Sequence, residues 1–360
     1  MKKLSKSYLL LPLALCFALT LIICSCTKDE PVNADPISIS TTTSAPITTT
    51  AQVTTSTPIT TLPNTTTEQI TTTAAITTTV PVTTAPPRDL SAVLPYANIQ
   101  RDAEHVLLYD ATENEILYFT GDAKIYPASA TKLLTLYYAL EILPKDTVFT
   151  VGNEINIAPA DSSKAKIRVG ERYTLTDISA ALLLPSGNDA AYTLAVTCGR
   201  YIAKDQNLSN LEALEVFMDS LNAYAKEKGF NDTHFVTPDG YHDPNHQTSM
   251  RDMLGIALLA KTSPLMCELM DMPKYKVTDL DGTHTQVWNN SNFLISPSSE
   301  QYYEWATGMK TGFHTPAGAC VIASAKKDGR ELIVLIFKCD NKTERFVDAK
   351  KFLEAGFAAK

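Results

Sequence analysis

The chain has 360 residues, 44% of them hydrophobic, and a formal net charge of −8 at pH 7. An acidic chain without a basic patch or arm is not expected to bind nucleic acid. The length allows one large domain with a substantial core, in addition to terminal segments of another kind.

The N-terminus has the features of an export signal. Three lysines precede an apolar run at residues 8–23, which is too short to favour a membrane span. Bacterial lipoprotein signals place a small residue before the modified cysteine. Ser25 before Cys26 fits this pattern, whereas the isoleucine before Cys24 does not. We therefore expect residues 1–26 to be a lipoprotein signal peptide ending at a lipidated Cys26, which would anchor the protein in the membrane. Ordinary secretion and an uncleaved anchor are the alternatives.

Residues 27–88 are expected to form a disordered tether rich in threonine and proline. Between Ile37 and Pro87 the only charged residue is Glu68, and aromatic residues are absent. Such a composition cannot bury a core. A flexible coil of about 60 residues spans ~45 Å, so the tether would hold the folded domain at a distance from the membrane.

The remaining residues, 89–360, are predicted to fold as one domain. Apolar runs flanked by turn residues predict strands near both ends, and helical spacing of apolar residues predicts helices between them. The predicted elements are, in chain order, strands 105–110 and 116–120, helices 129–142, 176–184, 189–198 and 210–228, strands 318–325 and 331–339, and a closing helix 344–357. This order indicates an α/β (α+β) fold class: an antiparallel sheet built from both chain ends, flanked by helices, with a helical subdomain.

Four cysteines lie in this domain: Cys198, Cys267, Cys320 and Cys339. The last two lie on neighbouring predicted strands, but a sequence cannot fix disulfide connectivity. Free buried thiols are the expectation.

The first polar motif, Ser129-Ala130-Thr131-Lys132, begins a predicted helix. There the unsatisfied N–H groups favour negative charge developing on the Ser129 hydroxyl, and Lys132 lies one turn away on the same face. A neutral lysine amine can accept the serine proton. This requires the lysine pKa to fall from about 10.4 towards neutrality, which a second buried cation, Lys310, would favour.

The second motif, Ser186-Gly187-Asn188, interrupts an apolar run and precedes a predicted helix. Its short polar side chains are expected at a buried loop tip. There Ser186 can shuttle a proton to a leaving amine, and Asn188 can bind a substrate amide.

The third motif, Lys310-Thr311-Gly312, precedes the penultimate predicted strand. A glycine at a strand edge lets a substrate backbone pair as an added strand. Lys310 supplies positive potential, and the Thr311 hydroxyl can bind a carboxylate. The backbone N–H groups of Ser129 and Phe313 are the expected oxyanion donors.

None of the three motifs is decisive by itself. Ser-Gly-Asn is more often a simple turn, and a Ser-x-x-Lys pattern can be an ordinary helix N-terminus with a solvated lysine. We adopt that second interpretation for the other occurrences of the pattern, at Ser25, Ser163 and Ser324. The order, spacing and context of the motifs together favour acyl transfer through a serine ester.

With the motifs in this order, residues 104–357 resemble the serine-type D-alanyl-D-alanine carboxypeptidases, the low-molecular-weight penicillin-binding proteins of the peptidase S11 type. The matching stretches are Tyr126–Lys132, Pro185–Ala190 and Gly308–Gly312, with support from Phe235–Tyr241 and the downstream His246 and Asp252. The family also has an arginine before its final helix that helps hold the substrate carboxylate, and Arg345 resembles it.

The resemblance implies a fold like that of β-lactamases and DD-peptidases and an activity on the cell wall. The expected reaction is removal of the terminal D-alanine from peptidoglycan stem peptides through an acyl-enzyme, and β-lactams such as penicillin would acylate the same serine. The enzyme would need no cofactor and would be extracytoplasmic, lipid-anchored and facing the cell wall. The implied catalytic residues are Ser129, Lys132 and Ser186, and the implied substrate-binding residues are Asn188, Lys310, Thr311, Gly312, Phe313 and Arg345.

Two departures from the family pattern stand out. Many relatives have histidine after Lys-Thr-Gly, where this chain has Phe313 followed by His314, so the substrate preference stays open. Many relatives also carry a C-terminal β-rich domain, which we do not expect here. The alternative functions are a β-lactamase and a non-catalytic surface lipoprotein that binds wall fragments. β-Lactamases of class A add a Glu-x-x-Leu-Asn segment after the second motif to activate the deacylating water, and the sequence lacks such a segment there.

Several histidines invite a metal-site interpretation: His234, His242 and His246, with Asp239 and Asp243 nearby. Their spacing is loop-like and lacks the helical His-x-x-x-His pair of zinc hydrolases. No catalytic metal is therefore expected.

Overall fold

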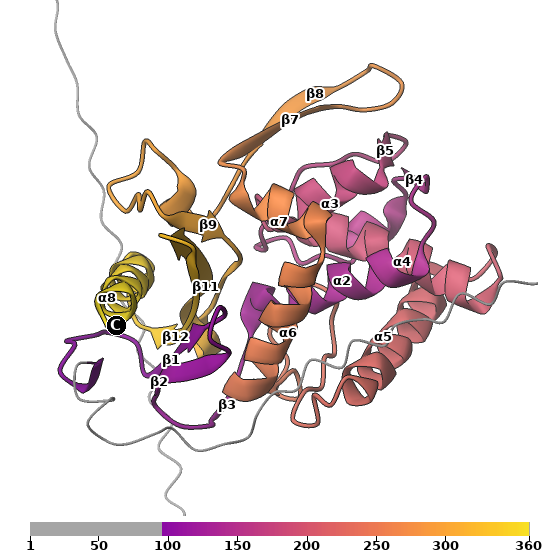
Figure 1. Cartoon of the computed structure of the whole chain (residues 1–360). Coiled ribbons are helices and arrows are strands. Elements are labelled where there is room, and N and C mark those ends of the chain that lie inside the picture. The colour runs from indigo at the N-terminus through magenta and orange to yellow at the C-terminus, as the bar shows by residue number, and fades with distance from the viewer. Residues whose placement is uncertain (1–95, 360) are drawn as a thin grey trace, which may run out of the picture. The chain divides into compact units, whose positions relative to one another are not determined.

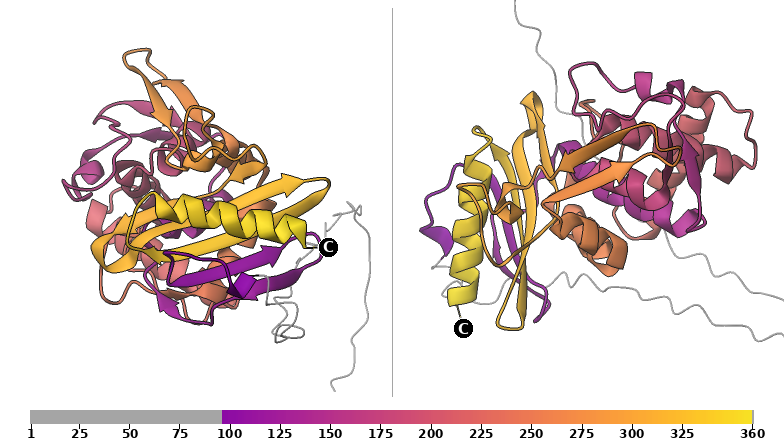
Figure 2. Two further views of the ribbon diagram at one scale, coloured as in Figure 1. Left: turned by 90° about the vertical axis from the view of Figure 1, so that its left-hand side faces the viewer. Right: turned by 90° about the horizontal axis from the view of Figure 1, so that it is seen from above.

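A six-stranded antiparallel sheet forms one side of the structure, a computed structural model that describes residues 96–359 (Figure 1). The expected signal peptide with Cys26 and the expected tether, residues 27–88, lie outside the described residues. One helix covers one face of the sheet and a group of helices covers the other (Figure 2). The predicted fold class, an antiparallel sheet flanked by helices with a helical subdomain, is confirmed.

The sheet joins the two ends of the described chain. Its strands are β1 (His105–Asp110), β2 (Glu115–Phe119), β9 (Ala306–Gly308), β10 (Thr311–His314), β11 (Gly318–Lys327) and β12 (Arg330–Cys339). Their order is β10-β11-β12-β1-β2, and β9 pairs with the part of β11 that β10 leaves unpaired. In the centre β1 runs antiparallel to β12. β10 therefore lies at an edge of the sheet.

Alternate side chains of the central strands fill two separate cores. On β12, the even-numbered residues from Leu332 to Ile336 belong to the core beneath α8 (Glu344–Ala358). The odd-numbered residues from Ile333 to Phe337 belong to the core shared with the other helices. This is the period-two alternation of a strand that is buried on both faces. Each fully buried side chain of this size contributes roughly 1.5–3 kcal/mol to folding.

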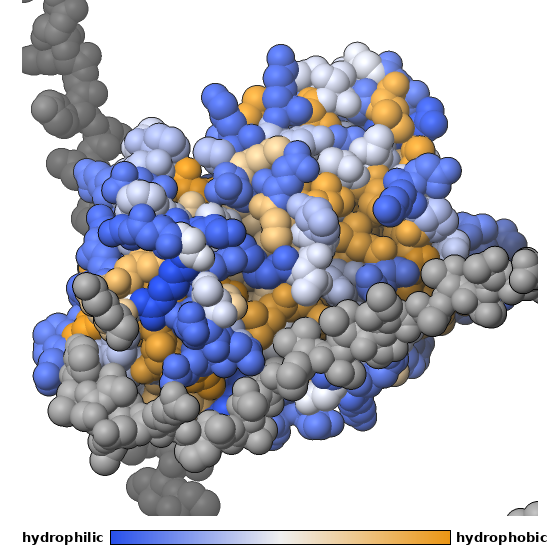
Figure 3. Space-filling view, viewed as in Figure 1, coloured by the Kyte–Doolittle hydropathy of each residue, from blue (hydrophilic) through white to orange (hydrophobic). Residues whose placement is uncertain are grey.

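The helical side is built around α2 (Lys132–Ile142), most of whose residues are buried. A helix that is apolar nearly all round belongs inside a core. The helices around it are α3 (Leu175–Leu183), α4 (Asn188–Ala203), α5 (Asn210–Glu227) and α6 (Met250–Thr262), and α7 (Pro264–Asp271) packs on α3 and α6. On the face shown in Figure 3, polar side chains dominate, and hydrophobic residues reach the surface mainly over this helical side.

Three short strand pairs complete the helical side. They are β3 (Lys124–Ile125) with β6 (Thr248–Ser249), β4 (Val148–Thr150) with β5 (Arg172–Thr174), and the hairpin of β7 (Lys274–Thr278) and β8 (Thr285–Asn289). The hairpin projects beyond the helices in Figure 1. Among the longer elements, this hairpin, α6 and α7 have no predicted counterpart.

The predicted helix 129–142 begins differently in the structure. Residues Ala128–Thr131 form a separate 3-10 helix, η1, and the α-helix starts only at Lys132. The tighter turn at its start places Ser129 outside the regular helix, which changes how its side chain is presented.

The four cysteines of the described residues are free, as expected from the sequence. Cys198, Cys320 and Cys339 are buried, and Cys267 is half-buried. Cys320 and Cys339 belong to cores on opposite faces of the sheet, so their neighbouring strands do not bring the two thiols together.

Within residues 96–359 no single helix combines the length and the apolarity needed to cross a membrane. The helices α6 and α7 meet those criteria only as a pair, and a bend of 98° separates them.

Candidate active site

Ser129 lies in the 3-10 helix η1, immediately before α2. The residue before it, Ala128, is buried and has a φ of +47°, which L-residues seldom adopt. From this turn the hydroxyl of Ser129 reaches the first residue of α2: the distance from Nζ of Lys132 to Oγ of Ser129 is 3.0 Å. The one-turn contact predicted for these two residues is present.

The buried amine of Lys132 has three hydrogen-bond acceptors. Its Nζ lies 3.0 Å from Oγ of Ser129, 2.7 Å from Oδ1 of Asn188 and 2.7 Å from the backbone carbonyl oxygen of Asp239. A charged ammonium donates to all three, whereas a neutral amine donates two hydrogen bonds and keeps a lone pair. When Asn188 and Asp239 take the two N–H groups, the lone pair faces the hydroxyl of Ser129.

The protonation of Lys132 is set mainly by its burial. Burial lowers the pKa of Lys132 to about 8, against the opposing attraction of the Asp239 and Asp189 carboxylates. At neutral pH the neutral amine is therefore far more populated than it is for an exposed lysine. This is the form that a general base requires.

The second motif forms the turn between α3 and α4. Ser186 is buried with a φ of +61° and lines the same cavity as Ser129. Asn188 is the first residue of α4, from where its side chain reaches the amine of Lys132. Both residues of the motif line the cavity, and Asn188 also contacts the buried lysine.

The carboxylate of Asp189, next in the chain, secures a loop that forms part of the cavity wall. It accepts hydrogen bonds from the backbone N–H groups of Ala165 at 2.8 Å and Lys166 at 2.7 Å. The backbone N–H of Asn188 donates to the carbonyl oxygen of Ser163 in the same loop at 2.8 Å. Desolvation raises the pKa of Asp189, and the hydrogen bonds that it accepts oppose the rise.

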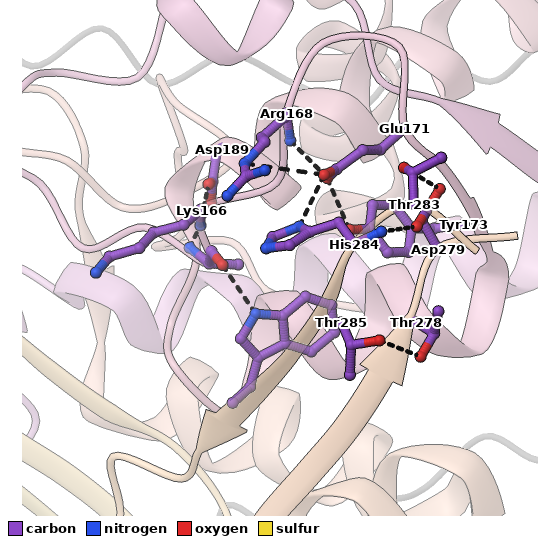
Figure 4. Close-up of polar contacts among 12 residues, drawn as sticks. Lys166, Arg168, Glu171, Tyr173, Asp189, Thr278, Asp279, Thr283, His284 and Thr285 are labelled. Carbon is purple, nitrogen blue, oxygen red and sulfur yellow. Dashed lines mark hydrogen bonds and ion pairs between the residues drawn. The ribbon is translucent and has the colours of Figure 1, made fainter. Parts of the chain in front are cut away.

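The loop that Asp189 secures also contacts the β7–β8 hairpin (Figure 4). Nε1 of Trp288 donates to the carbonyl oxygen of Ala165 at 2.8 Å. The carboxylate of Glu171 accepts a hydrogen bond from the hydroxyl of Tyr173 at 2.8 Å and lies 2.8 Å from Nδ1 of His284. The hairpin therefore braces the cavity wall, a role that the sequence did not indicate.

The third motif places a second buried lysine near the first. Nζ of Lys310 donates to the carbonyl oxygen of Thr311 at 3.0 Å. Burial, with repulsion from Lys132 and Arg345, lowers the pKa of Lys310 well below its ordinary value. The hydroxyl of Thr311 lies 2.7 Å from the hydroxyl of Ser291, and both residues line the cavity.

Gly312 lets the edge strand β10 run against the nucleophile turn. A Cβ at this position would lie 3.0 Å from Cβ of Ala128 and 3.2 Å from the backbone nitrogen of Ser129. Any larger residue would push the strand away from Ser129.

The edge strand also presents a backbone N–H group to the site. Lys310 exchanges both of its backbone hydrogen bonds with Ile322 of β11. In an antiparallel pair the direction of these groups alternates along the strand, so the N–H of Phe313 points away from β11. Gly312 packs against the nucleophile turn, so the N–H groups of Ser129 and Phe313 stay the candidate donors of an oxyanion site.

Phe313 stands where many relatives have histidine. Its ring is 45% exposed and lines the cavity, and Nζ of Lys342 lies 3.8 Å from the ring centroid. A cation over an aromatic face is attracted to it, so the departure places an apolar face and a positive charge at this position.

Arg345, in the first turn of α8, reaches the same region. Its Nη1 donates to the carbonyl oxygens of Gly312 at 2.8 Å and Cys320 at 3.3 Å. Its Nε has no hydrogen-bond partner among the described residues. A buried guanidinium beside a cavity is suited to bind a carboxylate.

These residues surround a cavity of about 570 Å³. Lys132 and Lys310 lie fully buried behind its wall. The predicted site residues that line it are Ser129, Ser186, Asn188, Thr311, Gly312, Phe313 and Arg345. Its walls also include residues that the sequence did not assign to the site, among them Asp161, Tyr241, His242, Ser291 and Lys342. Of these, only Tyr241 lies in a stretch that the family resemblance had singled out.

The three histidines considered for a metal site have other surroundings. His234 forms an isolated β-bridge with Gln247, and His246 is buried against Thr131. His242 packs against His314 with ring centroids 5.0 Å apart. Within residues 96–359, no group of three or more His, Cys, Asp and Glu side chains is placed to hold a metal ion.

Substituting Gly240 by alanine is expected to distort the nucleophile turn. Gly240 has a φ of +79°, and a Cβ there would lie 1.9 Å from the carbonyl oxygen of Ala128. Gly329 is a matched control, because its φ is +82° and nothing lies within 4 Å. Gly329→Ala should cost only the ~1–2 kcal/mol of a left-handed alanine, whereas Gly240→Ala should add ~1–3 kcal/mol or more for overpacking. Chemical denaturation measures both, and equal losses would contradict this packing.

Comparison with known proteins adds independent information. The family model described as D-alanyl-D-alanine carboxypeptidase, peptidase S11, matches residues 91–341. The chain is 27% identical over 271 residues to the D-alanyl-D-alanine carboxypeptidase DacF of Bacillus subtilis. The aligned region covers 73% of this chain and 64% of DacF. It is 29% identical over 270 residues to the D-alanyl-D-alanine carboxypeptidase DacC of Escherichia coli. That alignment covers 71% of this chain and 61% of DacC. The chain therefore spans somewhat less than two thirds of the length of these relatives.

Among solved structures, the Streptomyces K15 DD-transpeptidase is similar to this chain, with a TM-score of 0.66 and 26% sequence identity. The match covers 72% of this chain and 98% of that protein. The region matched by the family model contains all three motifs and most of the cavity that they surround. Since this region is well over half of the chain, the protein belongs to peptidase family S11, the D-alanyl-D-alanine carboxypeptidases.

Proposed function

We propose that this protein is a serine carboxypeptidase that removes the terminal D-alanine from peptidoglycan stem peptides. One observation carries the proposal: the Ser129 hydroxyl, the Lys132 amine and the Asn188 amide oxygen are joined by contacts of 3.0 and 2.7 Å beside a cavity bordered by an edge strand. The hydroxyl supplies a nucleophile, the amine supplies a base, and the edge strand can pair with an extended peptide.

In the first half-reaction, Oγ of Ser129 attacks the carbonyl carbon of the penultimate D-alanine while the neutral amine of Lys132 accepts the hydroxyl proton. The carbonyl oxygen becomes an oxyanion that the N–H groups of Ser129 and Phe313 stabilise. Collapse of this intermediate breaks the peptide C–N bond. The leaving amine takes the proton from Lys132 by way of the Ser186 hydroxyl, and a serine ester remains.

In the second half-reaction, water attacks the ester carbonyl and gives a proton to the amine of Lys132. The C–O bond of the ester breaks, the proton returns to Oγ of Ser129, and the shortened peptide leaves with a new carboxylate. The same buried amine thus serves as base in both halves of the reaction.

Three residues favour a substrate with a free C-terminal carboxylate. The hydroxyl of Thr311 and the guanidinium of Arg345 line the cavity, and Lys310 lies buried behind its wall. In a partly desolvated cavity, the positive charge of Arg345 attracts a carboxylate more strongly than it does in bulk water. A bound carboxylate would in turn favour the charged form of Lys310, whose pKa burial lowers. A peptide without this carboxylate should therefore be a poor substrate.

Incubation of the purified protein with a peptide ending in D-Ala-D-Ala tests the proposal. Free D-alanine should appear, and the same peptide with a C-terminal carboxamide should release much less D-alaninamide. A protein that binds penicillin but releases no D-alanine would contradict the proposal and support the non-catalytic wall-binding alternative.

The lifetime of a penicillin label separates the carboxypeptidase from a β-lactamase. We expect a fluorescent penicillin to stay attached to Ser129, because the amine expelled from a β-lactam ring remains tethered to the acyl group and hinders the water that Lys132 would activate. A fast β-lactamase needs a further group that activates water. Among the described residues that line the cavity, Asp161 is the only carboxylate, and it accepts a hydrogen bond from the hydroxyl of Tyr241 at 3.1 Å. Rapid turnover of the label would favour the β-lactamase.

We also propose that Cys26 carries a lipid that anchors the enzyme to the outer side of the cell membrane, with residues 27–88 as a tether towards the cell wall. The small residue before Cys26 and the threonine-rich composition support this arrangement. Labelling cells with a radioactive lipid precursor should mark the wild-type protein. A label that survives in Cys26→Ala would contradict the assignment.

A further inference from the structure

A buried polar chain lies beneath the nucleophile turn and takes no part in the steps described above. His246 is 2% exposed, and its ring stacks on Phe235 with centroids 4.8 Å apart. Its Nε2 lies 2.8 Å from Oγ1 of Thr131, which lies 2.8 Å from the carbonyl oxygen of Ala128. Burying an imidazole and a hydroxyl costs free energy unless both are fully hydrogen-bonded, so the hydrogen bonds of His246 and Thr131 must be well defined.

The directions of these hydrogen bonds follow from the backbone around His246. The N–H groups of Val236 and Thr237 point at Nδ1 from 3.0 and 3.3 Å, so Nδ1 is the acceptor and Nε2 carries the proton. Nε2–H donates to Oγ1 of Thr131, whose own proton goes to the carbonyl of Ala128. Burial, assisted by nearby histidines and a lysine, lowers the pKa of His246 to about 3, which keeps this neutral tautomer at working pH.

The chain ends at a residue whose unusual conformation shapes the site. Ala128 has a φ of +47°, and a non-glycine residue in this region costs of order 1–3 kcal/mol unless its surroundings hold it. Its carbonyl is held by the Thr131 hydroxyl on one side and packs against Gly240 on the other. The next residue is Ser129, so a small rotation at Ala128 would move the nucleophilic hydroxyl and the oxyanion N–H together.

We propose that His246, acting through Thr131, is a positioning residue that holds the Ala128–Ser129 turn in its reactive conformation; the inference rests on the proposed role of Ser129. Neither His246 nor Thr131 is among the residues that line the cavity. Their contribution is therefore to the rate of acylation, not to the binding of substrate or penicillin.

Stopped-flow acylation of the purified full chain by a fluorescent penicillin separates the two quantities, because its concentration dependence gives the dissociation constant and the acylation rate constant. His246→Leu should lower the rate constant roughly 10- to 100-fold with little change in the dissociation constant. Thr131→Val, which replaces the hydroxyl by a methyl group, should lower it similarly. The double variant should be acylated no more slowly than the slower of the two single variants, because each substitution interrupts the same series of hydrogen bonds.

The conservative variant His246→Gln provides the control. Its side-chain oxygen can accept from Val236 and Thr237, and its N–H can donate to Thr131, so most of the acylation rate should return. Thermal unfolding of each variant reports whether it is folded. If His246→Leu does not fold, the acylation rate of Thr131→Val tests the proposal instead.

The outcomes separate this inference from the proposed function. A wild-type protein that is never acylated would contradict the function itself. Wild-type rates in Thr131→Val, a Gln variant no faster than the Leu variant at equal thermal stability, or losses that multiply in the double variant would each overturn the positioning role of His246.

Discussion

Replacing Ser129 by alanine is expected to abolish acyl-enzyme formation and to lower D-alanine release by at least about 10⁴-fold. The substitution removes the atom that attacks the carbonyl carbon, and no other hydroxyl contacts the Lys132 amine among the described residues. Covalent labelling by a fluorescent penicillin and the accompanying mass increase measure the acyl-enzyme. Free D-alanine measures turnover.

The Ser129→Ala protein should remain folded, because the lost hydroxyl makes a single hydrogen bond and leaves only a small gap. A thermal midpoint close to that of the wild type would show this. Ser298→Ala, at an exposed serine away from the cavity, should be labelled at the wild-type rate. Penicillin labelling of Ser129→Ala at an undiminished rate would place the nucleophile elsewhere.

The two ends of the sheet could be predicted because their sequence signals are local. β1 coincides with the predicted strand 105–110, and Asp328-Gly329 marks the turn between β11 and β12. These strands are nearly continuous apolar runs because both of their faces are covered. That strands so far apart in the chain share one sheet is the only long-range feature of this part of the fold.

The β7–β8 hairpin could not be predicted in the same way, because little of it is buried. Each of its strands has one buried residue, Val277 in β7 and Trp288 in β8, and the other positions are exposed or half-buried. The helices α6 and α7 form one long apolar stretch whose division is marked only by Ser263 and the proline that follows it. In both cases tertiary packing, rather than periodicity, defines the element.

The candidate site shows the same division between local and long-range information. The contact between Ser129 and Lys132 follows from helical spacing alone. The other partners of the amine lie 56 and 107 residues away along the chain, at Asn188 and Asp239. Asn188 was placed in the site through its motif and the family resemblance. The Asp239 contact uses a backbone carbonyl, which any residue could supply, so no side-chain pattern could have identified it.

Replacing Lys132 by methionine is expected to slow acylation by roughly 10²–10⁴-fold, the usual contribution of a general base. Methionine fills much of the same buried space but cannot accept the Ser129 proton. It also leaves the oxygens of Asn188 and Asp239 without their donor, so some stability should be lost as well. The acylation rate constant for a fluorescent penicillin measures the effect, and Lys226→Met, at an exposed lysine, should leave it unchanged.

The pH dependence of acylation identifies the role of the Lys132 amine. Only the neutral amine can accept a proton, and its pKa is lowered to about 8. The wild-type rate should therefore rise with pH and approach a plateau above pH 8. His246 and His314, whose pKa values are lowered to about 3 and about 4, do not titrate in this range. The pKa of Lys310 is lowered as well, so the variant Lys132→Met is needed to show which of the two lysines titrates. The residual acylation rate of Lys132→Met should no longer rise near pH 8. A rise that persists in Lys132→Met, or a wild-type rate that falls as the pH increases from 6 to 9, would contradict the assignment of Lys132 as the base.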